Sequence, residues 1–233
     1  MNLTAELGLI TKTHDRHYHL DLQILGDETS NSLLNLIEAA SKSGTLKRFA
    51  PSEFGVDGLP FPFTAFKVAA IEKLRATPSL EYAIFITGFF LDFYGMPHAP
   101  TYMPGVSVIV DVENMKAAIP GEGNTPTVFT YTKDVAEFIA ASLDLPKWRQ
   151  RSIIAVVHDS PQDLRARKNT ELASNIPRYE FFPKNSLVGL VLVFGIAMEE
   201  GLFDFKGQSL NEMLPEIKSM SVEVFLQTYW GSK

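Results

Sequence analysis

The 233-residue chain contains no cysteine. Disulfide bonds, thiolate nucleophiles and zinc–thiolate sites are therefore excluded, and such a composition is typical of a cytoplasmic protein. The chain also lacks any basic run, since 21 Lys and Arg stand against 27 Asp and Glu for a net charge of −6. Neutralisation of phosphate charge supplies most nucleic-acid affinity, so this balance argues against a nucleic-acid partner.

Long hydrophobic runs are missing as well. The most apolar segment, 187–198, is well short of the roughly 20 residues that span a bilayer, and we expect it to be a buried helix. The first residues, 1–6, lack the basic start and apolar core of a signal peptide, and no basic amphipathic face is present. We therefore expect no membrane partner.

Several catalytic motifs are absent. No His-Glu-x-x-His, Gly-x-Ser-x-Gly or Gly-Lys-Ser/Thr sequence occurs, which argues against zincin, α/β-hydrolase and P-loop chemistry. His14, His17 and His19 lie close together, but their segment has no hydrophobic period that would give a metal a fixed scaffold. No metal site is predicted.

The apolar residues that are present recur with helical spacing in some segments and form short buried-strand runs in others. Helices are expected at 30–43, 65–75, 133–143, 186–198 and 222–229, and strands at 47–50, 81–87, 106–110, 128–131 and 153–157. In the second helix Val68, Ile71 and Leu74 are expected to face inward. This alternation indicates an α/β fold with a parallel sheet.

One stretch is more informative than the rest: Lys47-Arg48-Phe49-Ala50-Pro51-Ser52-Glu53-Phe54-Gly55-Val56-Asp57, followed by Lys67 early in a helix. This order resembles the NmrA-like and isoflavone-reductase-like branch of the atypical short-chain dehydrogenases. Further segments match in the family's order, at 32–40, 87–92, 111–114 with 120–123, 131–136, 145–148, and 214–217 with 225–226. Several ordered motifs are far more specific than any one of them.

The resemblance implies an incomplete NAD(P)-binding Rossmann-like fold, a doubly wound parallel sheet over residues 21–158. A small, mostly helical substrate lobe would occupy 159–233, and residues 1–20 would lie outside the match. The implied activity is NADPH-dependent reduction of a small aromatic substrate. The alternative is a non-catalytic NmrA-like protein that senses or binds a dinucleotide or a partner.

A glycine-rich turn that the family uses is not found. Gly-x-x-Gly-x-x-Gly seats the cofactor pyrophosphate on a helix N-terminus, whereas the nearest glycines here, Gly8, Gly26 and Gly44, are too sparse for it. We expect a chain that is truncated at its N-terminus, with impaired NADP binding. An exposed sheet edge would then offer a route to self-association.

The candidate catalytic residue is Lys67. The resemblance assigns its family counterpart a general acid/base role on phenolic substrates. Its place in the first turn of a helix, near N–H groups of partial positive charge, is expected to lower its pKa. The alternative is a solvated surface lysine.

Candidate cofactor-binding residues follow two predicted strands, where ligands bind in open α/β sheets. They are Pro51, Ser52, Glu53 and Phe54 after the first strand, and Gly88, Phe89 and Phe90 after the second. By resemblance, Phe54 packs beside the nicotinamide and Ser52 or Glu53 organises the loop. Gly88 would permit close backbone approach to a ligand. The alternative is that Ser52 caps a turn and the phenylalanines are core residues.

Overall fold

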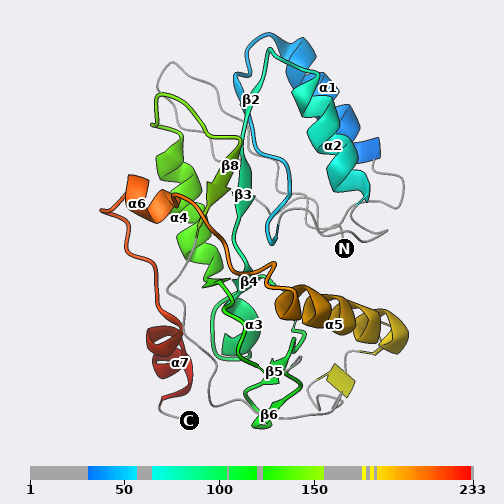
Figure 1. The fold of residues 1–233 in the computed structure, drawn as a ribbon, viewed down its shortest axis with the longest axis vertical. Helices are drawn as coiled ribbons and strands as arrows, with labels where there is room; N and C mark the ends of the chain where they lie inside the picture. Colours follow the sequence, from blue (N-terminus) through cyan, green and yellow to red (C-terminus); the bar gives the residue numbers. More distant parts are fainter. Residues whose placement is uncertain are drawn as a thin grey trace. The chain divides into compact units, whose positions relative to one another are not determined.

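A computed structural model describes residues 31–56, 65–103, 105–119, 123–154, 175–176, 179–180 and 183–231 (Figure 1). The chain divides into two compact units. The first contains the residues up to 86 together with 138–153, and the second contains 87–137 together with 154 onward. The predicted segment 1–20, the histidine group and the predicted boundary near residue 158 lie outside the described residues.

The first unit is a parallel α/β arrangement. Its elements are α1 (Asn31–Ser43), β1 (Arg48–Phe49), α2 (Ala65–Arg75), β2 (Glu81–Tyr82), β3 (Ile84–Ile86) and β8 (Arg151–Ile153). β1 pairs in parallel with β2, and β3 pairs in parallel with β8. α2 connects the parallel strands β1 and β2, and α1 lies beside it (Figure 1). The predicted α/β fold class is confirmed.

The helix α2 buries a different stripe from the predicted one. Ala70, Ile71 and Leu74 are at most 9% exposed, whereas Val68 is 55% exposed. The inward residues thus follow the i, i+3, i+4, i+7 spacing that begins at Lys67, and Val68 falls beside this stripe. The prediction was right for Ile71 and Leu74 and wrong for Val68.

A buried arginine joins three segments of the first unit. Arg48 is 5% exposed, and its Nε donates to Glu81 Oε2 at 2.7 Å. Its two terminal nitrogens donate to the carbonyls of Leu143 and Leu145 at 2.8 and 2.7 Å. The second Glu81 oxygen, Oε1, accepts the backbone N–H of Trp148 at 2.7 Å. The charge is compensated by a partner and by hydrogen bonds, as burial requires.

Among its described residues, the second unit holds one short parallel pair and one hairpin. Its elements are β4 (Phe89–Phe90), α3 (Asp92–Gly95), β5 (Val110–Asp111), β6 (Lys116–Ala117), β7 (Phe129–Thr130), α5 (Lys184–Glu199), α6 (Leu210–Met213) and α7 (Val222–Trp230). The helix α4 (Thr132–Ser142) begins in this unit. β4 pairs in parallel with β7, and β5 pairs in antiparallel fashion with β6. Of the predicted strand 106–110, only Val110 lies in a strand.

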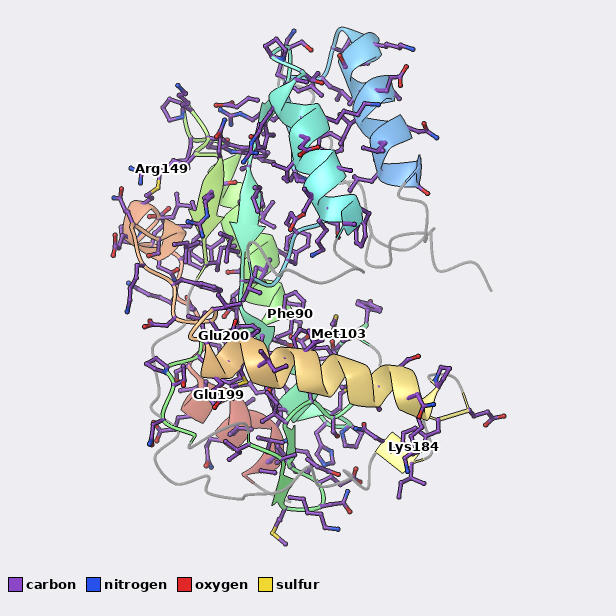
Figure 2. All side chains as sticks on the ribbon, turned by 45° about the vertical axis from the view of Figure 1, so that its right-hand side comes forward. Phe90, Met103, Arg149, Lys184, Glu199 and Glu200 are labelled. Atoms are coloured by element: carbon purple, nitrogen blue, oxygen red, sulfur yellow. The ribbon has the colours of Figure 1, made fainter. Side chains whose placement is uncertain are left out.

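The described side chains of the apolar helix α5 are only partly buried. Leu187, Ala197 and Met198 are buried, but Ile196 is 50% exposed. Lys184 begins the helix and Glu199 ends it (Figure 2). Across the part of the chain that the structure describes, neither α5 nor any other helix combines the length and hydrophobicity of a membrane span. The same described residues contain no cluster of His, Cys, Asp or Glu that could hold a metal ion.

The start of α4 depends on a carboxylate 40 residues earlier in the chain. Asp92 is fully buried and accepts both the backbone N–H of Thr132, at 3.0 Å, and its hydroxyl, at 2.6 Å. It also accepts the Thr101 hydroxyl at 2.7 Å. Asp92 thereby satisfies one of the N–H groups that a helix start leaves without an intrahelical acceptor.

A carboxylate of α4 itself, Asp134, holds the C-terminal segment. Asp134 accepts the backbone N–H of Met220 at 2.6 Å and is 7% exposed. Burial raises its pKa above the ordinary value of 3.8; repulsion from Glu137 and Asp92 adds to this, and the bond from Met220 opposes it. The folded state therefore binds this proton more tightly than the unfolded chain does. The associated stability is fully present below pH 3.8 and is lost as the pH rises through the folded-state pKa.

Asp134→Asn is expected to make the protein more stable at pH 7, because it removes a buried charge while an amide oxygen can still accept from Met220. Thermal unfolding of both proteins between pH 3 and pH 8 measures the effect. The melting temperature of the variant should exceed that of the parent at pH 7, and this advantage should shrink toward pH 3. An advantage that stays constant across this range would contradict the assignment.

Candidate functional site

The chain turns tightly at the carboxyl end of β1. Ala50, Pro51, Ser52 and Glu53 are all buried, and the Glu53 N–H donates to the Pro51 carbonyl at 2.8 Å. Phe54 is half-buried. The turn therefore places a buried carboxylate just beyond the strand, at the edge where open α/β sheets bind ligands.

Lys67 lies at the start of the buried stripe of α2. Its side chain is 24% exposed, and its Nζ lies 3.8 Å from Glu53 Oε2, whose side chain is 7% exposed. This separation corresponds to an ion pair rather than a hydrogen bond. The environment differs from that of a solvated surface lysine, because the neighbouring positions of the stripe are apolar and Lys67 supplies the one cation among them.

The pKa of Lys67 is lower than the ordinary value of 10.5, and burial is the main cause. The attraction of Glu53 acts in the opposite direction, since a nearby anion favours the charged amine. The sequence predicts the same direction, but from the field of the helix N-terminus; in the structure the main cause is burial on the inner stripe. A partly buried amine that releases its proton more readily is suited to acid–base chemistry.

Gly88 lies in the second unit, where the chain enters β4. Its φ is +69°, and a Cβ at this position would lie 2.2 Å from the backbone carbonyl oxygen of Val128. Close backbone approach is thus required here, and the approaching group is the protein's own chain ahead of β7. A role for Gly88 beside a cofactor stays a prediction.

The two phenylalanines after Gly88 differ in their surroundings. Phe89 is 3% exposed, and its ring stacks on Phe203 at 4.2 Å and meets the edge of Phe194 at 4.9 Å. Phe90, which is labelled in Figure 2, is half-buried by its solvent exposure. The core interpretation therefore fits Phe89 within the described residues, while cofactor contacts of either ring stay a prediction.

The predicted site residues lie in different units. Pro51, Ser52, Glu53, Phe54 and Lys67 belong to the first, and Gly88, Phe89 and Phe90 belong to the second. Within the first unit the structure pairs Lys67 with Glu53, a pairing that was not predicted from the sequence. A sequence signal for this pair existed: an acidic residue follows the strand, and a basic residue lies in the first turn of the next helix. These two positions are the two ends of one crossover connection.

Curated relatives of the chain are fungal and plant oxidoreductases. Oxidoreductase swnN of Arthroderma benhamiae is 28% identical over 280 residues, which take in 98% of this chain and 88% of that protein. Oxidoreductase BOA1 of Botryotinia fuckeliana is 36% identical over 169 residues, 69% of this chain and 56% of that protein. The isoflavone reductase homolog IRL of Zea mays is 24% identical over 89% of this chain and 74% of that protein. No family model matches the chain.

Solved structures of plant reductases share the fold. A structure from the pinoresinol-lariciresinol and phenylcoumaran benzylic ether reductases has a TM-score of 0.65 at 18% identity, covering 92% of this chain and 75% of its own. The complex of leucoanthocyanidin reductase with NADPH from Vitis vinifera has a TM-score of 0.51 at 16% identity, covering 86% of this chain and 72% of its own. The chain belongs to the isoflavone-reductase-like, or NmrA-like, family of oxidoreductases.

The isoflavone-reductase-like match has an internal length difference. The alignment with swnN spans 280 residues, more than the 233 of this chain, although it takes in 98% of them. The relative therefore carries segments that have no counterpart here. Across the full sequence of this isoflavone-reductase-like chain, no Gly-x-x-Gly-x-x-Gly turn occurs.

Proposed function

We propose that the protein is an NADPH-dependent reductase in which Lys67 moves a proton on a small aromatic substrate. The observation that carries this proposal is the ion pair of Lys67 with Glu53, 3.8 Å apart, at the carboxyl end of β1. The family supplies the reaction class, and the solved NADPH complex of leucoanthocyanidin reductase supports the choice of cofactor.

The residues fit one end of this cofactor better than the other. A buried carboxylate and a half-buried amine at a strand end suit the reacting end of a nicotinamide and its substrate. A pyrophosphate needs backbone N–H groups at a helix N-terminus after closely spaced glycines, and this sequence has no such turn. We therefore propose that NADPH binds this chain weakly.

NADPH, when bound, supplies a hydride to the substrate carbon. The protein's own residues would transfer the proton at the substrate oxygen. Lys67 Nζ gives or takes that proton, and its lowered pKa makes the exchange easier near neutral pH. Glu53 lies beside it as the counter-charge. The apolar neighbours on α2 limit access of water to the amine.

NADPH titration of the purified chain tests the proposal, with energy transfer from its two tryptophans as the signal. A screen of small phenolic substrates for NADPH oxidation follows. Binding with oxidation supports the reductase. Binding without oxidation of any substrate favours the non-catalytic, dinucleotide-sensing alternative, and no binding at millimolar NADPH overturns both.

A further inference from the structure

We propose that Glu53 is a positioning residue, which keeps the Lys67 ammonium charged and directed toward the carboxyl end of β1. This role rests on the proposed function in one respect, namely that the proton of Lys67 is used in catalysis. The ion pair itself is a property of the chain and can be measured without cofactor or substrate.

The geometry gives Glu53 a fixed place. The Glu53 N–H donates to the Pro51 carbonyl at 2.8 Å, so the turn after β1 determines where its side chain leaves the backbone. That side chain is 7% exposed, and its Oε2 lies 3.8 Å from Lys67 Nζ. Lys67 is carried by α2, a regular helix whose inner stripe is packed. Both partners thus project from segments with little freedom to move.

Two opposing effects act on the Lys67 amine. Burial disfavours its charge, and Glu53 favours it. Among the described residues Glu53 is the charged group that acts on Lys67. The next cation on α2, Lys73, pairs instead with Glu38 of α1 at 3.2 Å. Loss of the Glu53 charge would remove the attraction that opposes the effect of burial, and the pKa of Lys67 would therefore fall further.

Competitive labelling measures this effect directly. The chain is acylated with trace acetic anhydride between pH 6 and pH 11, and mass spectrometry of its peptides gives the titration midpoint of each lysine. We expect Glu53→Gln to shift the Lys67 midpoint to lower pH by about one unit. Glu53→Asp keeps the charge on a shorter stem and should recover most of the parent midpoint. Lys73, read from the same spectra, is the internal control and should not move.

An unchanged Lys67 midpoint in Glu53→Gln would overturn the proposal, and so would equal shifts of Lys67 and Lys73, which indicate a general loss of structure. If Glu53→Gln does not fold, Glu53→Asp tests the proposal instead. Its Lys67 midpoint must then shift in the same direction, by a smaller amount. Failure of the proposed function is a separate result. In that case NADPH oxidation is absent while the Lys67 midpoint still depends on Glu53.

Discussion

Replacement of Lys67 by methionine is expected to lower NADPH-dependent turnover by about 10²–10⁴-fold, the usual contribution of a general acid or base. Methionine preserves the length and the apolar stem of the side chain, so the inner stripe of α2 stays filled. NADPH affinity should change little, because the expected role of Lys67 is proton transfer. Steady-state rates with saturating substrate, together with the NADPH titration, separate the two effects.

A matched control, Lys73, lies six residues further along the same helix. Lys73 has a side-chain exposure of 30%, close to the 24% of Lys67, but it pairs with Glu38. Lys73→Met should leave turnover unchanged. Lys67→Arg adds a second comparison, since arginine keeps the positive charge but cannot release a proton in this range. Full turnover in Lys67→Arg would show that Lys67 acts through its charge alone.

Gly88→Ala is expected to destabilise the protein by about 3–5 kcal/mol, the largest effect on folding that we predict. Two costs combine at this position. An L-residue is strained at the observed φ of +69°, and its Cβ would meet a backbone oxygen at 2.2 Å, which cannot move aside without disturbing β7. Chemical denaturation measures the loss of unfolding free energy.

Gly44→Ala separates the two costs. Gly44 has almost the same φ, +68°, but nothing lies within 4 Å of the position its Cβ would take. This variant should lose only about 1–2 kcal/mol, the cost of the left-handed conformation alone. Equal losses in the two variants would contradict the clash at Gly88.

Sequence patterns predicted the bounds of the helices better than the short strands and the buried face of α2. α1, α2, α4 and α7 lie within one or two residues of their predicted bounds, because each has a sustained helical period and clear flanking residues. The hairpin of β5 and β6 was missed, since its strands have two residues each and show no period. Val68 was misplaced because a spacing of three is compatible with more than one helix face.

The sequence predicted which residues belong to the candidate site, but not which of them contact one another. The sequence singled out both Glu53 and Lys67, yet their pairing depends on how a turn and a helix pack, which no local pattern records. The same holds for Asp92 and Thr132, which are 40 residues apart. Gly88 was predicted to allow a close approach, but only the fold identifies Val128 as the neighbour.

The discontinuous first unit has a consequence for the order of folding. β3, at residues 84–86, pairs with β8, at residues 151–153. The Arg48 guanidinium donates to the carbonyls of Leu143 and Leu145, which are synthesised about 95 residues later. A growing chain that has reached only β3 therefore lacks both the strand and the acceptors that complete this unit. Contacts so distant in sequence slow folding, and the apolar edge of β3 stays open to other chains during synthesis.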